Sequence, residues 1–67
     1  MQFTIKEARQ YSGLTQEAMA KKLGVSTKTY QNYESGKVAM RIDTAKTFSK
    51  LTGIELSKII FLLSNYG

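Results

Sequence analysis

Hydrogen-bonding side chains with few acidic neighbours are concentrated in one short stretch of the chain. Thr27, Lys28, Gln31 and Asn32 lie there, and Glu34 is the only acid between residues 26 and 35. If this stretch is a helix, its spacing places the lysine and the two carboxamides on one face, with the threonine in the first turn. A solvated helix face usually mixes acids with bases in i,i+4 pairs. This face instead offers the donors and acceptors that can contact the edges of nucleic-acid bases.

The residue types needed for most catalysis or metal binding are missing or dispersed. The sequence contains no histidine and no cysteine, which excludes disulfides, thiolate metal sites and the commonest general base. Its five acids are far apart in the sequence, at Glu7, Glu17, Glu34, Asp43 and Glu55. We therefore expect no catalytic residues, no metal site and no cofactor, and a protein that is not an enzyme.

The charge balance favours a polyanionic partner. Ten basic and five acidic residues give a net charge of +5 and an isoelectric point near 9.7. Such a balance in a small domain favours nucleic acid first and anionic membrane second. The longest apolar run, 59–63, is too short to span a bilayer, and no signal peptide is apparent. We expect a single domain over residues 1–67, in the cytoplasm.

Spacings of three and four residues recur between the glycines, which predicts an all-α domain. The first helix is expected to begin after Thr4, because Thr4 and Glu7 form a capping-box pattern. Thr15 and Ser26 are in position to cap the next two helices. The five expected helices cover about residues 5–12, 16–23, 27–35, 42–52 and 56–64.

The connection between the second and third expected helices is only Gly24-Val25-Ser26. So short a connection forces a sharp crossing, which is the geometry of a helix-turn-helix. Glycine permits a positive φ in the turn, and Val25 is expected to pack beneath it. On the helix that follows, Tyr30 and Tyr33 lie opposite the polar face, so we expect both in the core.

In these features the sequence resembles the phage-repressor-like helix-turn-helix proteins, the Xre-type family that includes Cro and the lambdoid repressors. The matching segments are 14–17, 20–26, 33–37, 42–44 and 53–54, all in one register. The resemblance implies a compact five-helix lambda-repressor-like fold. It also implies a sequence-specific double-stranded DNA-binding transcriptional regulator, of bacterial or phage origin and nucleoid-associated. The length of the chain favours a stand-alone repressor of phage or mobile-element type.

The resemblance also assigns site residues. The positions that touch bases in the family correspond to Thr27, Lys28 and Asn32. Gln31 is expected to contact a base edge or a phosphate, and we group it with the base contacts. The positions that meet the DNA backbone in the family correspond to Gln16, Lys37 and Arg41. Lys21 and Ser26 are expected to contact the backbone as well. Gln16 aligns with a family glutamine that also steadies the first recognition residue. Arg9 and Glu34 match an ion pair between the first and third helices, which would neutralise the acid nearest the polar face.

The C-terminal helix poses a separate question, because its apolar residues cannot all face one small core. The residues in question are Leu56, Ile59, Ile60, Phe61, Leu62 and Leu63. An exposed apolar patch usually marks an interface, and a homodimer would match an inverted-repeat operator. The expected dimer interface is Leu56, Ile60, Phe61, Leu62 and Leu63. Alternatively, residues 56, 59, 60 and 63 complete the core while 61 and 62 are exposed.

Two other function classes compete with DNA reading. An antitoxin-like or anti-repressor module would keep this fold and bind a protein partner through the apolar C-terminal helix. Membrane binding is disfavoured, because Lys58 is the only basic residue in that helix and interfacial helices are usually basic along a polar face.

Overall fold

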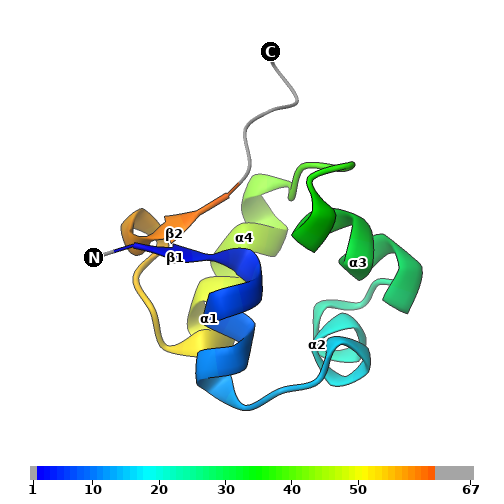
Figure 1. Cartoon of the computed structure of the whole chain (residues 1–67), viewed down its shortest axis with the longest axis horizontal. Helices are drawn as coiled ribbons and strands as arrows, with labels where there is room; N and C mark the ends of the chain where they lie inside the picture. Colours follow the sequence, from blue (N-terminus) through cyan, green and yellow to red (C-terminus); the bar gives the residue numbers. More distant parts are fainter. Residues whose placement is uncertain (1, 62–67) are drawn as a thin grey trace.

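The computed structural model describes residues 2–61, which form four α-helices, a short 3₁₀ helix and a pair of two-residue strands (Figure 1). In chain order the elements are β1 (Phe3–Thr4), α1 (Ile5–Ser12), α2 (Gln16–Leu23), α3 (Thr27–Ser35), α4 (Ile42–Thr52), η1 (Leu56–Lys58) and β2 (Ile59–Ile60). In Figure 1 the strand pair lies at the left of the molecule, and α2 and α3 lie at the right.

The first three helices begin where their caps were predicted. The Thr4 hydroxyl accepts from the Glu7 amide at 3.0 Å, and the Glu7 carboxylate accepts from the Thr4 amide at 2.9 Å, which completes the capping box. Thr15 caps α2 and Ser26 caps α3, each through a hydroxyl that accepts a backbone amide three residues later at 3.0 Å. These bonds satisfy amides that have no partner within the helix, so the helix starts are fixed locally.

The core lies between the four helices and is built around large side chains. Met19, Tyr30 and Phe48 are completely buried. Tyr30 packs edge-on against Tyr33, with ring centroids 6.2 Å apart, and Phe48 packs against Phe61 in the same manner at 6.1 Å. Both tyrosines of α3 are therefore core residues, as the sequence predicted, and α3 is held to the body of the protein by its inner face.

The prediction of a fifth helix was wrong for the described part of its range. Residues 56–58 form one 3₁₀ turn, and β2 then pairs in parallel with β1, with Phe3 opposite Ile59 and Thr4 opposite Ile60. Ile59 is buried whereas Ile60 is 41% exposed, which is the alternation of a strand. Two adjacent β-branched residues favour this extended form once a partner strand is near.

Leu62 and Leu63, which the sequence placed in this helix and in a dimer interface, lie outside the described residues. Within residues 2–61, no helix combines the length and apolar character needed to cross a membrane.

Candidate nucleic-acid interface

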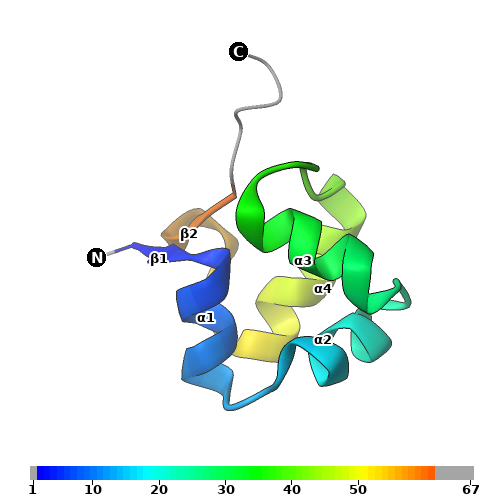
Figure 2. The same cartoon turned by 45° about the vertical axis from the view of Figure 1, so that its right-hand side comes forward.

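The turn between α2 and α3 sets the angle at which α3 is presented (Figure 2). Gly24 ends α2 with φ of 75°, and the amides of Gly24 and Val25 donate to the carbonyls of Lys21 and Ala20 at 3.1 and 3.0 Å. A Cβ at position 24 would meet no atom within 4 Å, so the glycine is needed for its backbone conformation and not for space. Val25 packs half-buried against the core, as predicted.

The outer face of α3 carries the four side chains expected to contact bases. Lys28 and Gln31 are exposed, whereas Thr27 and Asn32 are half-buried. Within residues 2–61, the side chains of Thr27, Lys28 and Asn32 form no hydrogen bond or ion pair, so their polar atoms are available to a ligand. The structure thus brings the four side chains onto one helix, opposite the buried tyrosines.

The residues expected to meet a DNA backbone lie around the ends of this helix. Lys21, Ser26, Lys37 and Arg41 are all exposed. The Ser26 hydroxyl is already engaged, since it caps α3 and donates to the Thr29 hydroxyl at 2.9 Å. Arg41 occupies the N-cap position of α4, and its guanidinium, which can only donate, forms no hydrogen bond or ion pair within residues 2–61.

The path of the loop after α3 is fixed by the backbone of Asn32. Its carbonyl accepts from the amides of Lys37 at 3.0 Å and Val38 at 3.3 Å. Both bonds turn the chain back over the end of α3. Lys37 is thereby held beside the C-terminal end of the helix.

A family model for helix-turn-helix proteins matches residues 5–59, which is most of the chain. The chain belongs to this helix-turn-helix family. The family is of the Xre and lambda-repressor type, whose members are DNA-binding transcription regulators. No curated protein and no solved structure matches the chain significantly.

In this helix-turn-helix protein, Arg9 of α1 and Glu34 of α3 form the ion pair that the resemblance implied. Arg9 Nε donates to Glu34 Oε2 at 2.5 Å, and its Nη1 donates to the Leu14 carbonyl at 3.0 Å. The two side chains are only 12% and 7% exposed. One guanidinium therefore ties α1 both to α3 and to the loop before α2.

The ion pair also settles the charge of the only acid on α3. Burial by itself would raise the pKa of the Glu34 carboxyl, but the hydrogen bond from Arg9, the nearby Tyr30 hydroxyl and the hydrogen bond from Gln16 outweigh it, and the pKa lies below its ordinary value. The hydrogen bond to Glu34 likewise raises the pKa of Arg9. Both groups are charged at neutral pH and neutralise each other, so Glu34 offers little repulsion to a phosphate.

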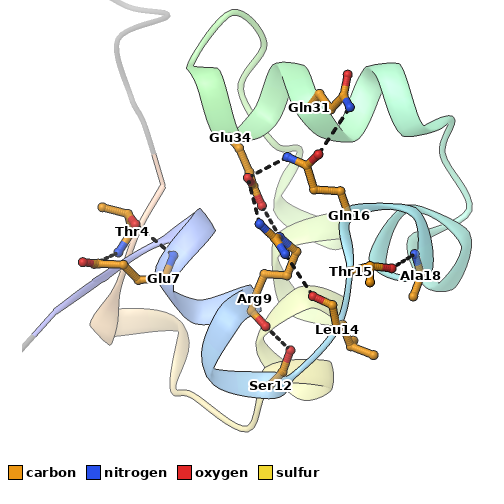
Figure 3. Close-up of polar contacts among 10 residues, drawn as sticks. All are labelled: Thr4, Glu7, Arg9, Ser12, Leu14, Thr15, Gln16, Ala18, Gln31 and Glu34. Carbon is orange, nitrogen blue, oxygen red and sulfur yellow. Dashed lines mark hydrogen bonds and ion pairs between the residues drawn. The ribbon is translucent and has the colours of Figure 1, made fainter.

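Gln16, at the first position of α2, connects this pair to the outer face of α3 (Figure 3). Its Nε2 donates to Glu34 Oε1 at 2.9 Å, and its Oε1 accepts from Gln31 Nε2 at 3.3 Å. The resemblance implied that Gln16 steadies the first recognition residue. In the structure its side chain is bonded to Gln31, which is long enough to reach the start of α2.

Tyr30 brings a polar group into the core. Its hydroxyl is buried and has no hydrogen-bond partner among the described residues. Burial raises the pKa of this hydroxyl far above its ordinary value, so it stays protonated. Over residues 2–61, no three His, Cys, Asp or Glu side chains are grouped as metal ligands would be.

Proposed function

We propose that this helix-turn-helix protein is a sequence-specific regulator of transcription that reads the major groove of double-stranded DNA with α3, as a stand-alone repressor of phage or mobile-element type. One observation carries the proposal. The outer face of α3 holds a lysine and three neutral polar side chains, and its only acid is turned inward and neutralised by Arg9. The positive charge of such a face attracts phosphate, while its side-chain carboxamides can form hydrogen bonds to bases.

The side-chain chemistry gives each contact a preferred partner. Lys28 suits the O6 and N7 acceptors of guanine, Asn32 suits the N6 and N7 of adenine, and the Thr27 methyl suits the methyl group of thymine. Phosphate contacts are assigned to side chains around the two ends of α3 and at the start of α2. They are Gln16, Lys21, Ser26, Lys37 and Arg41.

The function can be tested by selecting binders from a random DNA duplex pool at about 150 mM salt, where non-specific phosphate binding is weakened. We expect an enriched motif, and Asn32→Ala should lose about tenfold in affinity for it by removing one base contact. Lys50→Ala is the matched control, because Lys50 lies in the last turn of α4, outside the assigned contacts. A folded protein that enriches no sequence would overturn the proposal.

We propose further that the regulator is a homodimer, joined through an apolar groove beside β2. Leu56, Ile60 and Phe61 of the expected interface line this groove together with Met40 and Ile42. The groove has a volume of about 460 Å³, and Ile42 is 66% exposed at its edge. A two-fold dimer would present two α3 helices to an inverted repeat with half-sites about 34 Å apart.

The dimer is tested by replacing Ile42 with serine and measuring sedimentation equilibrium without DNA. We expect the wild type to be dimeric and Ile42→Ser to shift the equilibrium toward monomer, because the groove loses its most exposed apolar side chain. Tyr11→Ser is a suitable control, since Tyr11 is 69% exposed but lies on α1, away from the groove. A wild type that is monomeric both free and on its operator would contradict the dimer.

The same groove supports the alternative of an antitoxin-like or anti-repressor module whose main target is another protein. The two functions respond to different substitutions. If Phe61→Ala abolishes regulation in cells while Asn32→Ala does not, binding of a protein in the groove is the main activity. The reverse result supports DNA reading by α3.

A further inference from the structure

We propose that Gln31 reads an adenine, and that Glu34 determines which atoms of Gln31 face the DNA by acting through Gln16. This inference rests on the proposed function and deepens it, because it names the base contacted by one residue and two positioning residues behind it. It concerns three side chains joined in a chain of hydrogen bonds, 2.9 Å long at the first link and 3.3 Å at the second.

The orientation of the Gln16 carboxamide follows from the charge of Glu34. An ionised carboxylate can only accept hydrogen bonds, and Glu34 is ionised beside Arg9. The atom of Gln16 that faces it must therefore be the nitrogen. A flipped carboxamide would place two acceptors 2.9 Å apart. The Gln16 oxygen is thus turned away from Glu34 and toward α3.

The orientation of Gln31 follows in the same way from that of Gln16. Because Gln16 presents an oxygen, Gln31 must approach it with the nitrogen of its own carboxamide, and this is the bond observed. Figure 3 shows the Gln31 oxygen pointing away from Gln16, on the outer side of α3. Gln31 is left with one free acceptor, Oε1, and one free N–H, and the side chain is exposed.

An acceptor beside a donor matches one base better than the others. In the major groove adenine shows an N6 donor next to the N7 acceptor, whereas guanine shows two acceptors, cytosine a donor and thymine an acceptor with a methyl group. A phosphate offers acceptors only, so it could use the free N–H of Gln31 but would leave the oxygen without a partner. Adenine is therefore the partner that uses both free groups of Gln31.

The positioning also reduces the ordering that binding requires. An exposed glutamine without a partner samples several rotamers and both orientations of its carboxamide, and DNA binding must select one. The bond to Gln16 selects the carboxamide orientation beforehand. At the other end of this series of hydrogen bonds, Glu34 is held in place by its ion pair with Arg9.

The test is the base preference at one operator position, measured by the same duplex selection for wild type, Gln31→Ala, Gln16→Ala and Glu34→Gln. We expect an adenine preference that Gln31→Ala reduces about tenfold at a single position. Gln16→Ala and Glu34→Gln should weaken the same preference about threefold while the other positions keep theirs. A residue with a merely structural role would lower the affinity for all sequences alike.

Two controls keep the outcomes distinct. Lys21→Gln, on the same helix as Gln16, should reduce affinity uniformly without changing any base preference, as loss of a phosphate contact does. Gln16→Ala leaves the Arg9–Glu34 pair in place, so it remains decisive if Glu34→Gln does not fold. A wild type that enriches no motif overturns the proposed function. A motif whose adenine preference survives Gln31→Ala or Gln16→Ala overturns this inference alone.

Discussion

A few buried polar groups connect the stability of this helix-turn-helix protein to its DNA-reading face. Arg9, Glu34 and Gln16 are linked by hydrogen bonds, and the outermost member of the chain, Gln31, is exposed on α3. Tyr30 lies nearby with a hydroxyl that has no hydrogen-bond partner within residues 2–61. Substitutions at these positions are therefore expected to change stability as well as recognition.

Glu34→Gln should lower the free energy of unfolding by about 3 kcal/mol at pH 7, because it leaves Arg9 buried without its counter-charge. The folded pKa of Glu34 lies below the ordinary value of 4.5, so its contribution is present above that pH and is lost as pH falls through the folded pKa. Urea unfolding of both proteins between pH 7 and pH 3 would show the difference shrinking below pH 4.5. A difference that stays constant over this range would contradict the ion-pair explanation.

Tyr30→Phe should raise the free energy of unfolding by about 1 kcal/mol. It removes a hydroxyl that is desolvated on folding and forms no hydrogen bond within residues 2–61. Tyr11→Phe, at an exposed position, should change this free energy little. Thermal and urea unfolding of the three proteins would measure this. Destabilisation by Tyr30→Phe would mean that the hydroxyl donates to Glu34 in solution.

At the scale of elements, α3 is positioned by its ends and by its inner face. Ser26 caps its start, the bonds to the Asn32 carbonyl close its end, and the two tyrosines anchor it to the core. The helix can therefore present its outer side chains in a fixed arrangement.

Ser26→Ala should cost about 1 kcal/mol in the free energy of unfolding, because the Thr29 amide loses its acceptor. The protein should still fold, since the core contacts of α3 are unchanged. Ser35→Ala is the control at the other end of the helix, where the hydroxyl donates to the Asn32 carbonyl at 3.3 Å and caps no amide. Equal losses in the two variants would mean that the cap does not stabilise α3.

The four α-helices could be predicted because their signals are local. A threonine or serine caps the start of each of the first three helices, and a glycine follows the C-terminal end of all four, so the boundaries are set within a few residues. The segment from Leu56 to Phe61 could not be predicted in this way. Ile59 and Ile60 become a strand only because Phe3 and Thr4, near the other end of the chain, lie beside them, and a short apolar run is ambiguous between helix and strand.

For the site, too, the features that depend on local sequence could be predicted, and those that depend on contacts between elements could not. The polar face of α3 follows from helical spacing, and the Arg9–Glu34 pair followed from the resemblance. The bond between Gln16 and Gln31 was not foreseen, because it depends on the angle between α2 and α3 and on which side chain is long enough to bridge it. The exposure of Ile42 beside the apolar groove was also missed, because a helix wheel does not show where a neighbouring element stops.

At the scale of the whole molecule, the net charge of +5 should contribute to DNA affinity, and this contribution can be measured from how the affinity falls with salt concentration. From Lys21 to Arg41 there are five basic residues, and the only acid is Glu34. Because Glu34 is paired with Arg9, this part of the surface remains strongly positive.

Lys37→Gln should reduce the slope of log K against log salt concentration by about 0.9 per subunit, since one phosphate contact is lost. Base preferences should not change, because Lys37 lies beyond the end of α3. Fluorescence anisotropy with the selected operator, between about 50 and 300 mM salt, would give the slope. Lys50→Gln should leave the slope unchanged, and an equal effect of both substitutions would show that only the total charge matters.

The pairing of β1 with β2 brings two segments together that are far apart in the sequence. Phe3 and Ile59 are neighbours in space although they come from the two ends of the helix-turn-helix fold. Because the strands are parallel, residues 2 and 61 lie at opposite ends of the pair, and a linker between them must run back along the two-residue strands. With such a linker the fold should tolerate circular permutation, with new termini cut in the exposed turn at Gly13. In such a rearranged chain α2, α3 and α4 would keep their order. Recognition of DNA would then be independent of where the polypeptide begins.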